Sequence, residues 1–331
     1  MIITKAPFRI SFFGGGTDYP GWFEENGGAV LGTTIDKYCY ITCRYLPPFF
    51  DHYSRICYTL IETVKKFDDI KHPSVRECLK YMQIEKGIEI HHDGDLPART
   101  GLGSSSSFTV ALLHGLYALK GKMTSNAQLA REAIHVEQSI IRENVGCQDQ
   151  IFAAMGGLNL IEFSANNDFK VSPMAIPNER TENLHSHLML FYTGVSRMAS
   201  EIAADLIQQT PKKKAELKAI HQMVFEGVKL LNSSDDIAGF GKLLHESWKL
   251  KRSLSSKIST PLVDEIYEAA LAEGALGGKI LGAGGGGFVL IFAKPEHQAK
   301  IKEKLKQFLH VPFQFDSSGS QIIFYKQDEY A

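Results

Sequence analysis

The chain has 331 residues, which exceeds one ordinary domain of about 150 residues, so we expect two domains. A hydrophobic content of 44% is enough to build buried cores, and a formal net charge of −1 excludes the strongly basic field of a dedicated nucleic-acid binder. The five cysteines are odd in number, scattered and without a C-x-x-C pair, so neither a disulfide framework nor a zinc site is implied, and we expect buried free thiols.

The N-terminus carries no basic segment followed by an apolar run, and no uninterrupted apolar stretch approaches the length of a membrane span. We therefore expect a soluble, cytoplasmic protein whose partners are small molecules, with neither a nucleic acid nor a membrane among them. The sequence carries no signal for an oligomeric state.

The first predicted strand covers residues 2–13 and ends in three glycines followed by Thr17 and Asp18. Arg9 lies inside this apolar strand, where an arginine must meet an anion or reach solvent. It is therefore either a cation that holds a catalytic carboxylate or a member of an ordinary structural ion pair. A pair of strands is expected over residues 29–45, where β-branched and aromatic residues are frequent.

A short helix over residues 73–81 and a strand over residues 87–92 lead to the most distinctive stretch, residues 96–108, which read Leu-Pro-Ala-Arg-Thr-Gly-Leu-Gly-Ser-Ser-Ser-Ser-Phe. Apolar residues recur at helical spacing beyond it, so the serines fall at a helix N-terminus, where their side chains can cap free amides. Glycines let an anion approach the backbone, and the helix dipole favours negative charge there. The stretch predicts a phosphate cradle.

The candidate nucleotide-binding residues of this cradle are Pro97, Thr100, Gly101, Leu102, Gly103, Ser104, Ser105, Ser106 and Ser107. A flexible Gly-Ser linker is the alternative interpretation, but the flanking proline and the long apolar-periodic helix argue against it. Because the lysine of a P-loop is missing, backbone amides and hydroxyls would hold the anion.

A longer helix, capped by Thr124 or Ser125, is expected to run to about residue 144 and to carry Glu137. Magnesium that accompanies bound phosphates prefers hard oxygen ligands, so Ser105 and Glu137 are the candidate metal ligands. Glu137 taken alone would be an ordinary surface glutamate.

A short helix should hold Asp149 in its first turn, and this carboxylate is the leading candidate to activate an acceptor hydroxyl. Arg9 is the cation that would keep it ionised. The alternative for Asp149 is a simple partner of the helix dipole.

Strands over residues 158–163 and 188–192 flank a polar segment, so we place a domain boundary near residue 183, giving domains 1–183 and 184–331. The second domain should contain four helices, then a strand, a helix and a closing strand; their expected ranges are 199–207, 215–231, 237–250, 261–273, 288–292, 295–309 and 321–325.

Residues 282–287 read Gly-Ala-Gly-Gly-Gly-Gly and formally match G-x-G-x-x-G. A dinucleotide fingerprint opens a helix, whereas this run opens a strand, so we reject a nicotinamide site. The run is either a second glycine loop that closes over substrate, with Gly284 and Gly285 as contacts, or a plain tight turn.

Three stretches, residues 6–19, 97–107 and 279–288, resemble in order and separation the motifs of the GHMP kinases, the family of galacto-, homoserine, mevalonate and phosphomevalonate kinases. The resemblance implies a two-domain α+β fold, with an N-terminal domain like ribosomal protein S5 domain 2 and a ferredoxin-like C-terminal domain. It further implies ATP and Mg²⁺ as cofactors, Glu137 as a magnesium ligand, and Asp149 as the catalytic base beside Arg9.

The first motif has three glycines where galactokinases have Gly-Glu-His, and in this form it is similar to kinases of D-glycero-D-manno-heptose 7-phosphate; residues 193–197 support that branch. The similarity implies phosphorylation of the anomeric hydroxyl to the 1,7-bisphosphate, for nucleotide-activated heptose biosynthesis. An L-fucokinase, another GHMP sugar kinase, or a nucleotide-binding protein that lost its chemistry are the alternatives. The candidate substrate-binding residues are Gly15, Gly16, Thr17, Asp18, Arg197, Gly284 and Gly285.

Overall fold

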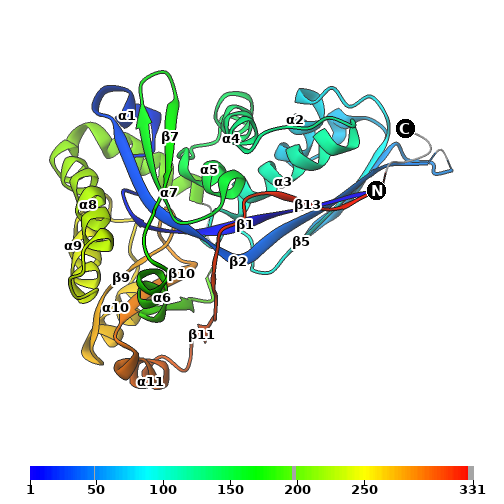
Figure 1. Cartoon of the computed structure of the whole chain (residues 1–331). Helices are drawn as coiled ribbons and strands as arrows, with labels where there is room; N and C mark the ends of the chain where they lie inside the picture. Colours follow the sequence, from blue (N-terminus) through cyan, green and yellow to red (C-terminus); the bar gives the residue numbers. More distant parts are fainter. Residues whose placement is uncertain (48, 196–198, 327–331) are drawn as a thin grey trace.

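Two β-sheets organise the chain in the computed structural model, which describes residues 1–47, 49–195 and 199–326 (Figure 1). The larger sheet is built on β1 (Ile2–Phe13) and β2 (Gly28–Tyr45), which pair antiparallel with Ile2 opposite Cys43. Its main path has the order β13-β1-β2-β5-β3-β4, while β6 and β12 pair with β2, and β7 pairs with β6. The bounds of these other strands are β3 (Ser54–Cys57), β4 (Ile61–Val64), β5 (Ile88–Gly94), β6 (Asn159–Ser164), β7 (Asp168–Pro173), β12 (Phe315–Asp316) and β13 (Gln321–Tyr325).

The strand β2 is the main departure from the sequence-based prediction, because one strand of 18 residues stands where a pair was expected. The prediction of a strand pair is wrong for a physical reason. Strand β1 pairs with β2 along one edge, whereas β6, β12 and β5 share the other edge in succession. The strand thus changes partners along its length without a turn.

Helices cover one face of this sheet, and α3 (Ser104–Leu119) lies against β1 and β2 (Figure 1). Most of α3 is buried because α4 (Asn126–Ile134) and α5 (Gln148–Met155) pack on it from the other side. Ser125 caps α4 as predicted, and the helix continues as the π-helical segment η2 (His135–Ile141). The remaining helical segments of this part are α1 (Pro20–Asn26), η1 (Phe67–Asp69) and α2 (Pro73–Tyr81).

The second sheet has the order β11-β8-β10-β9 and is antiparallel throughout. The expected helix over residues 295–309 is shorter than predicted, because it ends at Lys304 and a turn then brings Leu309 into a strand beside β8. The bounds of the elements here are α6 (Asn178–Ser186), β8 (Leu188–Tyr192), α7 (Ala199–Gln209), η3 (Thr210–Lys212), α8 (Lys214–Asn232), α9 (Ala238–Leu254), α10 (Pro261–Ala272), β9 (Ala275–Ile280), β10 (Phe288–Ala293), α11 (Pro295–Lys304) and β11 (Leu309–His310).

Aromatic side chains join the two sheets through α9. Phe240 of that helix makes edge-to-face contacts with Phe12 and Phe13 of β1, at centroid distances of 5.4 Å and 4.9 Å, and it also lies 6.1 Å from Phe292 of β10. Such rings contribute a large buried apolar area together with a preferred geometry. The two sheets therefore share one continuous hydrophobic core.

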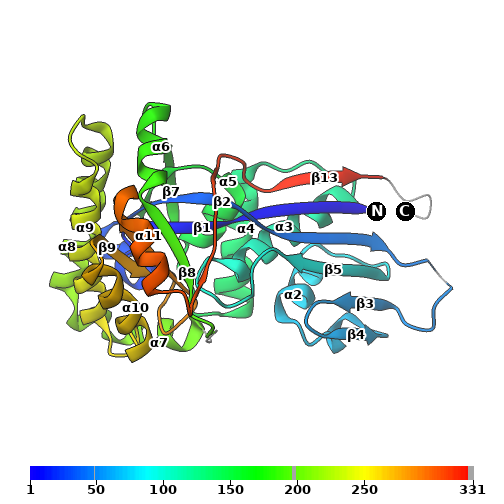
Figure 2. The same ribbon diagram turned by 90° about the horizontal axis from the view of Figure 1, so that it is seen from below.

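The division of the chain near residue 183 remains a proposal. That residue lies inside α6, directly before the first strand of the second sheet. The C-terminal strands β12 and β13 return to the larger sheet, so the end of the chain packs with its beginning (Figure 2). Lys326 and Met1 accept hydrogen bonds from each other's backbone nitrogen atoms.

The turn at residues 97–103 touches the glycine loop at residues 282–287 backbone to backbone. Phe288 N donates to Thr100 O at 3.2 Å, and a Cβ at Gly101 would lie only 2.3 Å from Leu281 O. A Cβ at Gly287 would lie 2.1 Å from Thr100 O. Glycine is required on both sides, because any side chain would separate the two parts of the molecule.

We predict that Gly101→Ala destabilises the protein more than Gly121→Ala. Both glycines have positive φ, +84° and +65°, so both alanines carry a similar strain of about 1 kcal/mol. Only the alanine at residue 101 also collides with backbone, since nothing lies within 4 Å of the Cβ position at Gly121. Urea unfolding of both variants measures the difference, and equal midpoints would show that the close approach has no energetic weight.

Candidate active site

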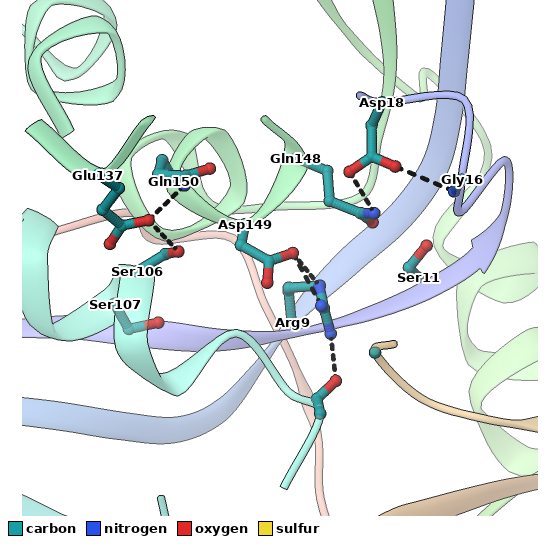
Figure 3. A network of polar contacts seen from close by, with 12 residues as sticks. Arg9, Ser11, Gly16, Asp18, Ser106, Ser107, Glu137, Gln148, Asp149 and Gln150 are labelled. Atoms are coloured by element: carbon teal, nitrogen blue, oxygen red, sulfur yellow. Dashed lines mark hydrogen bonds and ion pairs between the residues drawn. The ribbon is translucent and has the colours of Figure 1, made fainter. Parts of the chain in front are cut away.

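Arg9 and Asp149 are in direct contact (Figure 3). Arg9 points from β1 toward the first turn of α5, where its Nε and Nη2 lie 2.8 Å from Asp149 Oδ1. Its Nη1 donates to Gly101 O at 2.7 Å, so one guanidinium joins the carboxylate to the cradle. The Arg9 side chain is 4% exposed and that of Asp149 is 27% exposed, so the carboxylate alone remains open to a reactant.

The predicted cradle precedes α3, and its geometry suits an anion. Gly103 is the N-cap residue with φ +79°, and a Cβ there would lie 3.4 Å from Asp149 Oδ2. Within the described residues, the amides of residues 101–106 donate to no backbone carbonyl. Unpaired amides at a helix N-terminus attract phosphate oxygens, and Asp149 lies beside them.

The expectation that the serines cap the helix is wrong, because no side chain caps α3. Each buried hydroxyl has another partner instead: Ser106 Oγ donates to Glu137 Oε2 at 2.9 Å, and Ser107 Oγ donates to Pro7 O at 2.9 Å. Ser104 Oγ accepts from Arg99 N at 3.1 Å, whereas Ser105 is exposed. The amides therefore stay free for a ligand.

Glu137 is completely buried in η2 and faces the cradle (Figure 3). Ser106 and Gln150 both donate to its Oε2, while Oε1 has no hydrogen-bond partner among the described residues. Burial raises the pKa of this carboxyl to about 7. A buried carboxylate oxygen without a partner, next to a hydroxyl, is a donor set that fits Mg²⁺. The serine at this carboxylate is Ser106 and not the predicted Ser105.

Asp18 lies on the other side of Asp149, held between two segments of the chain. Gly16 N donates to its Oδ1 at 3.0 Å and Gln148 Nε2 to its Oδ2 at 2.7 Å. Burial raises the pKa of Asp18, and the nearby Asp149 adds to the rise. A Cβ at Gly146 would lie 2.0 Å from Asp18 Oδ2, so this approach requires a glycine.

Thr17 has a structural role in the turn that carries Asp18. Its hydroxyl donates to Gly14 O and Ala29 O, both at 2.9 Å, which fixes the turn against β2.

The glycine loop packs against the segment that precedes α10. Gly285 N donates to Ile258 O at 2.9 Å, and a Cβ at Gly284 would lie 2.5 Å from the same oxygen. Gly285 also lines a cavity of about 280 Å³ together with Thr193 and Val195. The structure thus places these two glycines against the segment before α10, and their contact with substrate stays a prediction. Arg197 lies outside the described residues.

Two buried lysines lie in this site, and the sequence analysis did not identify either of them as a functional residue. Lys279 of β9 is 4% exposed and donates to Ser11 O at 2.8 Å and to Phe12 O at 3.0 Å. Lys251 of α9 is 7% exposed and donates to Gly282 O at 2.6 Å. Burial lowers the pKa of Lys251 to about 8 and lowers that of Lys279 well below its ordinary value. The available signal was the position of Lys251 on the apolar face of its helix, three residues beyond Trp248.

We predict that wild type loses stability as the pH rises and that Glu137→Gln removes this loss. The pKa of Glu137 is raised from 4.5 to about 7, so its contribution to stability is lost as the pH rises through that window. Without divalent cations, the melting temperature of the variant relative to wild type should therefore increase between about pH 5 and about pH 8. Magnesium should stabilise only the wild type. The exposed Glu179→Gln is the control, and an unchanged difference across this pH range would contradict the prediction.

Comparison with known proteins agrees with this architecture. Residues 70–157 match the family model described as GHMP kinases N terminal domain, and residues 228–311 match GHMP kinases C terminal. Among the described residues, no helix combines the length and the apolar character needed to cross a membrane.

Individual relatives cover nearly the whole chain. The D-glycero-alpha-D-manno-heptose 7-phosphate kinase of Campylobacter jejuni is 27% identical over 317 residues, which are 92% of this chain and 93% of that protein. The bifunctional fucokinase/GDP-fucose pyrophosphorylase of Arabidopsis thaliana is 26% identical over 94% of this chain but only 31% of its own length. The crystal structure of a D-glycero-D-manno-heptose 1-phosphate kinase from Bacteroides thetaiotaomicron superposes with a TM-score of 0.78 at 22% identity, covering 99% of this chain and 100% of that chain.

The predicted fold class and family are thereby confirmed, since both family models match in the expected order. The chain belongs to the GHMP kinase family, with its two-part α+β fold, and is an ATP-dependent sugar kinase.

Proposed function

We propose that this kinase transfers the γ-phosphoryl group of ATP to the anomeric hydroxyl of D-glycero-D-manno-heptose 7-phosphate, giving the 1,7-bisphosphate. The observation that carries the proposal is the position of the Asp149 carboxylate, which Arg9 holds between the cradle and Asp18. The full-length similarity to the heptose 7-phosphate kinase of Campylobacter jejuni supports this choice of sugar.

The nucleotide would place its phosphates at the N-terminus of α3. Free amides of residues 101–106 and the helix dipole favour the charge of a triphosphate there. Glu137 and the hydroxyl of Ser106 would hold Mg²⁺, whose chemical contribution is to neutralise charge on the phosphate oxygens. Their place beside the cradle supports the assignment of ATP and Mg²⁺ as cofactors.

Asp149 would bind the acceptor hydroxyl and take up its proton. Arg9 keeps this carboxylate oriented by two contacts to one oxygen, which leaves Oδ2 on the side of the cradle turn. Phosphoryl transfer passes through a loose transition state, so alignment and charge neutralisation contribute more than proton abstraction. Arg9 serves both purposes, because it orients the base and adds positive charge.

The sugar would lie on the Asp18 side of Asp149. Gly15 and Gly16 form the turn that carries Asp18, and the Cβ positions at these glycines face Lys251 and Leu217. Thr17 stabilises that turn by donating to Gly14 O. The assignments of Arg197, Gly284 and Gly285 to substrate binding, and of the enzyme to the cytoplasm, remain predictions.

Replacing Asp149 by asparagine tests the proposed catalytic role. Asn keeps the size of the side chain but neither accepts a proton nor carries a charge, so kcat should fall by at least about a hundredfold. Nucleotide affinity should stay nearly unchanged, as measured by calorimetric titration with ADP. Asp168→Asn, which breaks the exposed Arg131–Asp168 pair, is the matched control. Near-normal turnover by the Asp149→Asn enzyme would remove this residue from the mechanism.

A panel of acceptors tests the identity of the sugar. We expect magnesium-dependent ADP release to show its highest kcat/KM with D-glycero-D-manno-heptose 7-phosphate, and a lower value with the same heptose lacking the phosphate. A preference for L-fucose would instead favour the fucokinase alternative, which the similarity to the plant enzyme keeps open. Absence of ADP release with every sugar would contradict the proposed reaction.

A further inference from the structure

Lys251 occupies a buried position between two glycine segments of the site. Its Nζ donates to Gly282 O at 2.6 Å, and a Cβ at Gly15 would lie 3.5 Å from the same nitrogen. An ammonium has three protons to donate, and only this carbonyl accepts one among the described residues. Burial of an ammonium group is costly unless an anion or further acceptors take up its remaining hydrogen bonds.

The charged groups around Lys251 lie on or next to β1, β9 and α5. Arg9 on β1 and Lys279 on β9 are cations, whereas Asp18 after β1 and Asp149 on α5 are carboxylates. Arg9 is already engaged with Asp149, and Lys279 donates to backbone carbonyls. Burial also raises the pKa of Asp18, which reduces the negative charge it offers. Burial thus weakens the charges of Asp18 and Lys279 alike, and Arg9 and Asp149 are paired with each other. Lys251 is left with no carboxylate bound to it among the described residues, and this arrangement suits an anionic ligand.

The contacts of Lys251 lead toward Asp149, where the phosphoryl group would be transferred. A Cβ at Gly282 would lie 2.5 Å from Gly101 Cα, so the residue that accepts from Lys251 touches the cradle. The carbonyl of Gly101 in turn accepts from Arg9, which holds Asp149. Lys251 is therefore linked to the cradle through Gly282, and through Gly101 to the guanidinium that holds Asp149.

We propose that Lys251 is a further catalytic residue that contacts the phosphoryl group during its transfer and, with Arg9, neutralises its charge. The inference rests on the proposed position of phosphoryl transfer at Asp149, but not on the identity of the sugar. In the step, the acceptor oxygen forms a bond to the γ-phosphorus while the bond from that phosphorus to the bridging oxygen breaks. The hydroxyl proton moves to Asp149, and ADP leaves with the electron pair, while Lys251 stays protonated.

The titration of Lys251 adds a measurable signature. Its pKa is lowered to about 8, mainly by burial and then by Arg9, so the charged form is lost as the pH rises through that value. The kcat/KM for ATP reports groups of the free enzyme. It should therefore fall as the pH rises above about 8 in the wild-type enzyme.

Two substitutions test the proposal. Lys251→Met keeps the aliphatic stem but removes the charge, and it should lower kcat about a hundredfold, on the scale of losing one donor to a transition state. Its affinity for ADP should change little. Lys251→Arg keeps the charge at all accessible pH values, so it should retain more activity and lose the decline above pH 8. Lys249→Met, an exposed lysine of the same helix, is the control.

The assay uses whichever acceptor of the sugar panel is turned over, so a wrong sugar would contradict the proposed substrate and leave this test intact. Binding gives a second readout: wild type should bind adenylyl imidodiphosphate more tightly than ADP by a factor that Lys251→Met reduces. Normal kcat in a folded Lys251→Met enzyme would overturn the proposal. If that variant does not fold, an alkaline decline in Lys251→Arg identical to that of wild type would overturn it.

Discussion

The contact between Arg9 and Asp149 is the interaction on which the site depends. One guanidinium reaches the first turn of α5 with two nitrogens and the carbonyl of Gly101 with a third, so β1, α5 and the cradle are tied to a single side chain. Because Arg9 is almost completely buried, loss of the Asp149 carboxylate would leave an uncompensated charge, which is costly in a protein interior. The same contact that orients the carboxylate therefore also stabilises the local fold.

Glycines decide how closely the two halves of the molecule approach each other. Gly101, Gly282 and Gly287 lie at positions where a single Cβ would strike backbone of the opposing segment. The aromatic contacts of Phe240 fix the two sheets at that separation. The shared core thus brings two glycine segments together, with Asp149, the cradle and Lys251 beside them.

Burial shifts the protonation of the site in opposite directions for acids and bases. It raises the pKa of Glu137 and Asp18 and lowers the pKa of Lys251 and Lys279, since the charged form of each is disfavoured away from water. Perturbed groups that gather around one point are typical of functional sites. Bound magnesium and phosphate would offset these costs, so charges that are unfavourable without ligands become complementary to them.

Local patterns in the sequence were sufficient for several features. The pattern of apolar residues predicted β1 and α2, and Arg9 stood out because an arginine in an apolar strand has few physical explanations. The glycine-rich turn before a helix predicted the cradle, whereas Glu137 and Asp149 each had an ordinary alternative and took their expected roles from the resemblance to the GHMP kinases. Tertiary structure alone decided the rest. The single long β2, the return of β13 to β1, the contact of Ser106 with Glu137 and the burial of Lys251 all depend on partners far away in the chain. Residue spacing records a periodicity within one element, but which distant backbone or carboxylate lies opposite is determined only when the elements pack.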